Sequence, residues 1–451
     1  MSTAYSGLSP RAAHTAIYIK ETDSLYVYGG YDLNNVLGSL QIYSFNASFW
    51  EDEWGISLRS RHFPAKIDNT LLKAVLHQNE EEARLWGLKS DASFFRNILL
   101  SISDESLLRR QRSLKTPTSH HDLTEILEEL TDESNIVRPH NRYGHAASGV
   151  DILGGGFVIF GGKLENGSLS NELWLFNVTA AQTEKQWSIR ATNSTIQPPP
   201  LTRHTITLAN DYLYVFGGSL KSGQFSEKIY RIKLLNDSND EQWEEVHPRG
   251  GKALDVRVVA HSTVFHKASN SLIVYGGVVV SVARFSKLSD RMFAFQLTER
   301  HWTEIHYPRM PLRDAYIPRE RAFHTATLIG NYMIVFGGYS HRHNKEEICY
   351  DNQMYLYHLG CHTWINQDVL GMNENSKYPK QQGVFAHAAT VRNDNTLLIV
   401  GGYHGNVNAD LLAYTLPPML LINRNESTFD PEAVCFKHTG VSECLSGKDL
   451  G

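Results

Sequence analysis

The chain has 451 residues, of which 41% are hydrophobic and 11% aromatic, and its formal net charge is −5. This composition is typical of a well-buried globular core, and the small negative charge gives no electrostatic support for binding nucleic acid. No apolar run approaches the roughly 20 residues that cross a bilayer as a helix, and the N-terminus lacks the apolar core of a signal peptide. We therefore expect no direct membrane insertion by this segment.

One unit of sequence occurs six times along the chain. Its first copy has Arg11 and His14, an apolar run that ends in Gly29-Gly30, a second apolar stretch, and Trp50. The second glycine precedes the tryptophan by 20 to 26 residues in the first five copies, whereas the sixth copy has no tryptophan. This regularity is typical of a repeat protein. We expect the six copies near residues 11–54, 142–190, 203–246, 257–305, 321–367 and 385–422.

Each copy has the pattern of a small sheet. Its apolar run is short and rich in β-branched and aromatic residues, which favours a buried strand over a helix. The paired glycines end that strand where a Cβ would block the backbone, and the tryptophan gives the outer strand a large apolar surface. One four-stranded sheet cannot bury both of its faces, but a ring of such sheets can. The sequence therefore predicts an all-β, six-bladed β-propeller over residues 1–422.

A long insertion separates blades one and two. Residues 55–139 contain no Gly-Gly pair and are rich in charge. Apolar residues between Leu123 and Leu130 have helical spacing, which predicts a partly helical and otherwise disordered insertion. An error in the gene prediction is the alternative. A basic run inside the insertion fits either a solvated loop or a proprotein-convertase processing site, and it consists of Arg109, Arg110 and Arg112.

The sixth copy raises the question of how the ring closes. A propeller closes when one terminus completes a sheet begun by the other, because an unpaired edge strand is a liability. Residues 1–10 show no strand pattern of their own. We expect the missing outer strand to lie upstream of Met1, with Leu416–Ile422 as the alternative. On this interpretation the chain is a fragment of a longer protein.

The repeats resemble kelch repeats, and two segments resemble the propellers of the attractin and multiple EGF-like domains protein eight family. These segments are residues 349–364, which read CYDNQMYLYHLGCHTW, and residues 401–414. The resemblance covers most of the chain apart from the insertion. It implies a disulfide between Cys349 and Cys361, and hence an oxidising compartment. Two unpaired thiols too far apart to bridge are the alternative.

The same resemblance implies an extracellular context. Residues 423–451 contain Cys435 and Cys444 and resemble the truncated start of the cysteine-rich plexin–semaphorin–integrin (PSI) module that follows the propeller in this family. Six N-x-S/T sequons add weight to that context as candidate N-glycosylation sites. They are Asn46, Asn166, Asn177, Asn193, Asn236 and Asn425.

The sequence offers little catalytic chemistry. It contains no G-x-S-x-G, P-loop or H-E-x-x-H pattern. We interpret His341 and His343, with two glutamates nearby, as a solvated polar loop, although metal binding there stays open. We expect no enzymatic activity and no cofactor. A histidine recurs once in each blade, and we expect this set to be structural, each imidazole hydrogen-bonding backbone between blades: His14, His145, His204, His261, His324 and His387.

An arginine stands before the innermost strand of five blades. We expect these arginines to lie around one mouth of the central channel. The resemblance to kelch propellers suggests that arginines there bind acidic peptides through bidentate contacts. The alternative is that they bridge neighbouring blades. The candidates for partner binding are Arg11, Arg142, Arg203, Arg257 and Arg321.

These observations support three hypotheses about function. The first is a non-enzymatic protein–protein interaction module, part of the ectodomain of a large single-pass membrane receptor that regulates signalling. Its partners would be a protein or peptide ligand at a propeller face and neighbouring EGF-like and PSI modules. The second is a cytosolic kelch adaptor that presents substrates to a ubiquitin ligase or binds actin. The third, a kelch metalloenzyme, needs a cluster of metal ligands that the sequence does not supply.

Overall fold

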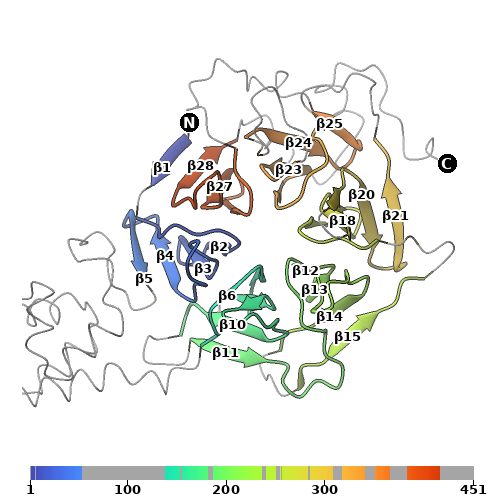
Figure 1. Cartoon of the computed structure of the whole chain (residues 1–451), viewed down its shortest axis with the longest axis horizontal. Helices are drawn as coiled ribbons and strands as arrows, with labels where there is room; N and C mark the ends of the chain where they lie inside the picture. Colours follow the sequence, from blue (N-terminus) through green and yellow to red (C-terminus); the bar gives the residue numbers. More distant parts are fainter. Residues whose placement is uncertain are drawn as a thin grey trace, which may run out of the picture.

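The computed structural model describes residues 2–5, 7–52, 138–152, 155–180, 186–235, 240–249, 254, 256–282, 285–307, 317–340, 350, 352–365 and 383–416. Within them, six four-stranded antiparallel sheets stand in a ring around a central axis (Figure 1). The fold is therefore the all-β, six-bladed propeller that the repeats predict. Nearly all of the 55–139 insertion lies outside the described residues, so its helix and its basic processing site stay predictions. The described part of the chain contains no helix that is long and apolar enough to cross a membrane.

The first five blades use consecutive strands of the chain, with neighbours paired in an antiparallel ladder. Blade one contains β2 (Thr15–Ile19), β3 (Ser24–Tyr28), β4 (Leu40–Ser44) and β5 (Phe49–Asp52). Blade two contains β7 (Ala146–Val150), β8 (Gly156–Phe160), β10 (Leu173–Asn177) and β11 (Trp187–Arg190). Blade three contains β12 (Thr205–Ala209), β13 (Tyr212–Phe216), β14 (Ile229–Ile232) and β15 (Trp243–Val246).

The next two blades follow the same order. Blade four contains β16 (Ser262–His266), β17 (Ser271–Tyr275), β20 (Met292–Gln296) and β21 (His301–Ile305). Blade five contains β22 (Thr325–Ile329), β23 (Tyr332–Phe336), β24 (Met354–His358) and β25 (Thr363–Ile365). Two short two-stranded ribbons complete the described strands, one of β6 (Arg142–Tyr143) with β9 (Lys163–Leu164) and one of β18 (Val278–Val282) with β19 (Phe285–Leu288).

Blade six closes the ring with a strand from the other end of the chain. It contains β26 (Ala388–Arg392), β27 (Thr396–Val400) and β28 (Leu411–Thr415), and its outer strand is β1 (Ser2–Tyr5). Strand β1 pairs antiparallel with β28, from Ser2 opposite Tyr414 to Tyr5 opposite Leu411 (Figure 1). The expectation that this strand lies upstream of Met1 was therefore wrong. Four residues of mixed polarity give no periodic pattern, and the strand is defined by the unpaired edge of β28 instead.

The hydrophobic core fills the seams between neighbouring sheets. Every residue of the central strands β8 and β23 is buried. In blades two to five, the tryptophan of the outer strand packs against an aromatic ring that ends the second strand of the preceding blade. The ring centroids are 5.2 Å apart for Trp187 and Tyr28, 5.4 Å for Trp243 and Phe160, 5.0 Å for Trp302 and Phe216, and 5.5 Å for Trp364 and Tyr275. The predicted role of the tryptophans is thus confirmed.

The paired glycines are required where two blades meet. Gly217 has a φ of +68°, and a Cβ on it would lie 2.5 Å from Cε1 of His261 and 2.6 Å from the carbonyl oxygen of Val258. Both neighbours belong to blade four. The first glycine of each pair therefore lets the histidine of the next blade approach the backbone, which explains why the two signals recur together.

Candidate functional site

One face of the propeller collects the segments that precede the first strand of each blade and the loops that follow the Gly-Gly pairs. We call this the mouth face. Around the axis, the residue before each repeated histidine donates its backbone N–H to the carbonyl of its counterpart in the preceding blade, at 2.7 to 2.9 Å. These six bonds form a closed ring, and all six residues have left-handed φ values between 52° and 62°. They are Ala13, Gly144, Arg203, Ala260, Phe323 and Ala386.

Three of the five predicted partner-binding arginines are buried inside their own blades. Arg11, Arg142 and Arg321 stand three residues before the histidine and are at most 1% exposed. Their Nη1 atoms donate to the carbonyl of the first glycine of the same blade, at 3.2, 3.0 and 2.7 Å respectively. The prediction that they bind a partner was wrong, because a partner cannot reach them.

The remaining two arginines occupy other positions in the repeat. Counting back three residues from the histidine gives Leu201, Val258 and Val384 in blades three, four and six. Arg203 is instead the residue directly before its histidine, and Arg257 precedes its histidine by four residues. Both side chains are exposed. Alignment on the histidine would have separated these two from the buried set.

Arg203 extends over the mouth of the channel. Its guanidinium carbon lies 5.2 Å from the ring centroid of Phe323, which belongs to blade five. Its charge also acts on Tyr31 in blade one: burial raises the pKa of that phenol, and Arg203 opposes the rise. A side chain from blade three thus faces residues of blades one and five. Two bonds of the backbone ring hold its main chain in a left-handed conformation, so the direction of the side chain is fixed at its base.

Aromatic side chains border Arg203 on the same face. The rings of Phe323 and Phe385 are 6.0 Å apart, and those of Phe385 and Tyr403 are 5.4 Å apart. Tyr31 and Tyr143 form a second pair at 5.5 Å. All of these side chains are partly exposed. The mouth face therefore presents a cation within an aromatic rim, a combination that is enriched at protein interfaces.

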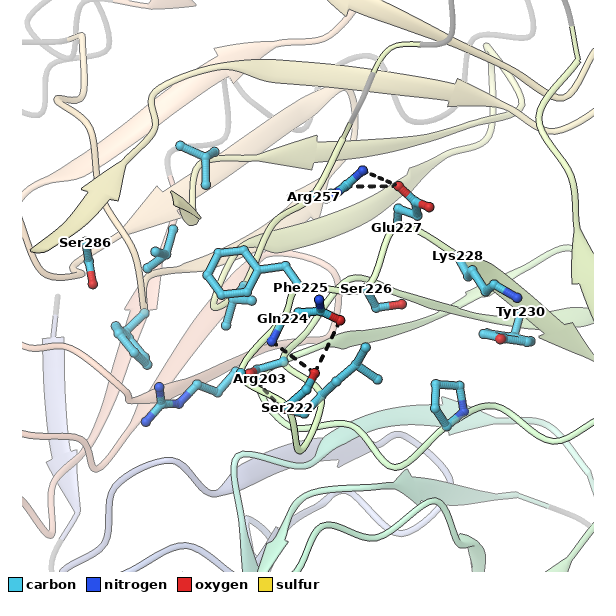
Figure 2. Close-up of a pocket in the computed structure, with 18 of the residues that line it drawn as sticks. Arg203, Ser222, Gln224, Phe225, Ser226, Glu227, Lys228, Tyr230, Arg257 and Ser286 are labelled. Carbon is cyan, nitrogen blue, oxygen red and sulfur yellow. Dashed lines mark hydrogen bonds and ion pairs between the residues drawn. The ribbon is translucent and has the colours of Figure 1, made fainter. Parts of the chain in front are cut away.

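A cavity of about 1180 Å³ opens beside this rim, between blades three and four. Part of its apolar lining comes from Val259, Val278, Phe225 and Phe323, which belong to one packed cluster. Figure 2 shows Arg203 on one side of the cavity and the ion pair of Arg257 with Glu227 on another, with Phe225 between them in this view.

Three of the described residues that line the cavity are cations, and two of these three are paired. Arg257 lies 2.9 Å from Glu227, and both side chains are more than half exposed. Lys228 lies 2.9 Å from Glu245. Among the described residues, no carboxylate pairs with the guanidinium of Arg203. Among the described residues of the lining, Arg203 is thus the uncompensated charge.

The six repeated histidines are buried in the seams rather than open to the channel. Burial lowers the pKa of each one, to about 3 for His204, His261 and His387. In four seams the Nε2 atom contacts a hydroxyl of the preceding blade, at 2.8 to 3.1 Å. The expected hydrogen bond to backbone of the preceding blade acts on His14, His204 and His324, through Val400, Phe160 and Tyr275. These contacts support the structural role that the repeat suggests. The hydroxyls belong to Thr15, Thr205, Ser262 and Thr325.

Other candidate sites lie partly outside the described residues. Within the described ranges, no three His, Cys, Asp or Glu side chains gather as a metal site would need, but His341 and His343 lie outside them. Cys361 is disulfide-bonded, while Cys349 is not described, so their pairing stays a prediction.

Four of the six sequons can be placed. Asn46, Asn166 and Asn193 are exposed, and Asn177 is half-buried. The side-chain oxygens of Asn166 and Asn177 accept hydrogen bonds from the hydroxyls of Ser168 and Thr179 in their own sequons. Asn236 and Asn425 lie outside the described residues. Glycosylation stays a prediction at all six.

Six four-stranded blades, joined through glycine–histidine seams, define the protein as a kelch-type β-propeller. Residues 113–412 match the family described as Attractin/LZTR1 beta-propeller, and the chain belongs to this family. The human Multiple epidermal growth factor-like domains protein 8 is 31% identical over 418 residues, which cover 91% of this chain and 11% of that protein.

Other relatives show the same partial coverage. The rat protein of the same name is 38% identical over 289 residues, which cover 62% of this chain and 10% of the relative. Host cell factor from Drosophila melanogaster is 27% identical over 251 residues, which cover 51% of this chain and 16% of the relative. The chain thus spans only about a tenth of the length of the first relatives that it matches.

Proposed function

We propose that this propeller is a non-enzymatic protein-interaction module and that its partner binds the mouth face. One observation carries the proposal: loops of blades three and four enclose an open cavity beside an uncompensated arginine and an aromatic rim. Loops held on a rigid scaffold are the usual place for recognition. Arginine and aromatic side chains supply most of the binding energy at many protein interfaces.

The proposal includes a larger context for the module. The human relative carries epidermal growth factor-like domains in its name and is many times longer than this chain. By analogy, the propeller is one part of the ectodomain of a single-pass receptor that regulates signalling, next to EGF-like and PSI modules. The exposed sequons at Asn46, Asn166 and Asn193 and the bonded Cys361 support an oxidising, extracellular location.

A crosslinking experiment tests which face binds. A photoreactive amino acid replaces Gln224, which is exposed at the cavity, or Asp211, which is exposed at the opposite end of the same blade. The propeller is then added to intact cells and irradiated. We expect a discrete protein adduct from position 224 and none from position 211. Equal labelling, or an adduct from position 211 alone, contradicts the proposal.

Mass spectrometry of the secreted chain tests the location. We expect a disulfide-linked peptide that contains Cys361 and glycans on several of the six asparagines. Free thiols together with unmodified asparagines contradict the ectodomain and favour a cytosolic kelch adaptor instead.

A further inference from the structure

Cys361 forms a disulfide with a cysteine that lies outside the described residues. The chain has four cysteines, so the partner is Cys349, Cys435 or Cys444. The family resemblance implies Cys349, but a disulfide requires the two Cα atoms to lie within about 7 Å of each other. The strands of blade five indicate which of the three candidates can approach Cys361.

Blade five holds Cys361 at the end that is far from Tyr350, the residue after Cys349. Tyr350 forms a β-bridge with Tyr339 on the mouth face. Strand β24 then runs away from the mouth for five residues, which span about 13 Å, before the turn that contains Cys361. Consecutive Cα atoms are about 3.8 Å apart, so Cys349 stays about 9 Å or more from Cys361. This separation argues against Cys349 as the partner.

The turn that contains Cys361 is fixed to the core between blades five and six. The N–H of Cys361 donates to Nδ1 of His358 at 3.0 Å, and His358 is buried. The ring of His358 lies 4.9 Å from that of Tyr332, which belongs to the hydrophobic cluster shared by the two blades. Cys361 is thus held in a defined position on the face opposite the mouth.

The C-terminal tail, residues 417–451, leaves the propeller beside this turn. The residue before the tail, Leu416, is buried and packs in the same cluster as Tyr332. Its N–H donates at 2.9 Å to the carbonyl of Asn395, which lies in the turn between β26 and β27 on the face opposite the mouth. Cys435 and Cys444 follow Leu416 by 19 and 28 residues. At roughly 3.3 Å per extended residue, both cysteines can reach the turn of blade five.

The predicted glycans leave this part of the opposite face uncovered. The turns between the third and fourth strands of the blades lie on this face. Blades one, two and three have a sequon in or next to that turn, at Asn46, Asn177 and Asn236, whereas the sequence of blade five has none there. Because a glycan is bulky, a segment of chain packs more easily over blade five than over the first three blades.

We propose that Cys361 forms its disulfide with Cys435 or Cys444, and that this bond attaches the C-terminal tail to the face opposite the mouth. Its formation removes two protons and two electrons from the two thiols, and the disulfide of a thiol oxidoreductase accepts them and becomes a dithiol. The inference rests on the proposed function, because such a bond persists in an oxidising, extracellular location. The bond determines where the chain continues, and it leaves the mouth face open to a partner.

Mass spectrometry of the secreted chain, after alkylation of free thiols, identifies the partner of Cys361. Trypsin alone leaves Cys349 and Cys361 in one peptide, so the digest also needs Asp-N, which cleaves between them before Asp351. We expect the fragment 351–367, which contains Cys361, to be linked to residues 430–437 or 438–448, which contain Cys435 and Cys444 respectively. A link between Cys361 and Cys349, or an alkylated Cys361, overturns the inference.

A cleavable variant tests the attachment of the tail directly. A site for a sequence-specific protease is inserted after Asn423, and the cleaved chain is analysed on a denaturing gel. We expect the tail to stay attached until a reductant is added. The Cys361→Ser variant should release the tail without reductant, whereas Cys349→Ser, the matched control, should retain it.

Release of the tail from the unsubstituted chain without reductant also overturns the inference, and this result does not depend on whether Cys361→Ser folds. A Cys349–Cys361 link in an oxidised, glycosylated chain overturns the inference alone. Free thiols together with unmodified asparagines contradict the proposed extracellular location as well.

Discussion

The seam that closes the ring is built differently from the seam between blades three and four. In the latter, the ring of Phe216 lies 5.6 Å from that of His261 and 5.0 Å from that of Trp302, and the hydroxyl of Thr205 contacts the histidine at 3.1 Å. In the closing seam, the equivalent positions hold Val400 and Ala388. Among the described residues, His14 of this seam has neither an aromatic neighbour of this kind nor a hydroxyl partner.

Other contacts hold blades one and six together. Arg392 donates two hydrogen bonds to the carboxylate of Asp23, at 2.9 and 2.8 Å, and its guanidinium lies 4.0 Å from the ring centroid of Phe45. The β1–β28 ladder also joins the two ends of the chain. Backbone pairing and a surface ion pair therefore replace aromatic packing where the ring closes.

The seam between blades two and three has both aromatic packing around its histidine and an ion pair between blades. It keeps the aromatic contacts of Phe160 with His204 and Trp243, but Ala146 replaces the hydroxyl residue. It also contains a buried ion pair, since Arg190 and Glu241 are at most 4% exposed and are joined by several hydrogen bonds. Both seams that lack the hydroxyl thus carry an arginine–carboxylate pair between blades.

Acidification should weaken every seam, and this is the largest effect that we predict. The unfolded chain binds protons at histidine below about pH 6.5, whereas burial lowers the folded pKa of His204, His261 and His387 to about 3. Stabilisation is therefore full above pH 6.5 and is lost as the pH falls towards 3, by up to about 1.4 kcal/mol per pH unit for each histidine. Melting temperature measured from pH 7.5 to 4.5 checks this expectation.

Hydrogen exchange at decreasing pH compares the stability of the closing seam with that of the seam between blades three and four. Among the described residues, His14 lacks the hydroxyl and aromatic contacts that His261 makes, so β2 and β26 should lose protection at a higher pH than β12 and β16. Simultaneous loss around the ring would show that the seams act as one cooperative unit and that their differences in packing have no local consequence.

Removal of one ion-pair partner should reduce the free energy of unfolding more at the buried pair than at the partly exposed pair. Glu241→Ala leaves Arg190 buried without a counter-charge, and we expect a loss of about 3–5 kcal/mol in the free energy of unfolding. Asp23→Ala at the closing seam should cost less than about 1 kcal/mol, because both partners are partly exposed. Denaturant titration at low and high salt measures both, and only the second should depend on salt. Similar losses would mean that burial does not determine how much an ion pair contributes to the free energy of unfolding.

Deletion of residues 1–5 tests the backbone contribution to closure. It removes β1 and leaves the edge of β28 unpaired, so we expect a loss of about 2–4 kcal/mol from the lost ladder, together with association between molecules. Thermal unfolding and light scattering provide the measurements. An unchanged melting temperature would show that the ring is closed without this strand.

The sequence was sufficient to predict the propeller but not its closure. Each sequence signal reflects one local requirement. The apolar run reflects a buried strand, the paired glycines reflect a close approach in the seam, and the tryptophan reflects an apolar contact of the outer strand. Strand β1 reflects no local requirement, because Ser2–Tyr5 are defined as a strand only by pairing with residues about 400 positions away. Non-local pairing of a short segment leaves no periodicity to detect.

The candidate site was only partly predictable for a related reason. Arg11 and Arg203 both precede a histidine, but a difference of two residues in spacing decides whether the guanidinium enters the blade or extends over the channel. The cavity between blades three and four depends on how loops from two blades meet, which no single repeat specifies. The positions of the repeats could be predicted from the sequence, whereas the surface that their loops form together could not.

Ala388→Ser should make the closing seam more like the others, with the smallest effect and in the stabilising direction. Ala388 occupies the position of Thr205 in blade three, so a serine there places a hydroxyl towards the imidazole of His14. We expect a gain of about 0.5–1.5 kcal/mol, the usual net contribution of one hydrogen bond. Ala389→Ser is the control, because the next residue along the strand points to the other face. The gain should appear as a higher denaturation midpoint with an unchanged slope, and it should be absent in the His14→Phe background. A gain that persists without His14 would show that the hydroxyl acts through some other group and that the missing contact is not what distinguishes this seam.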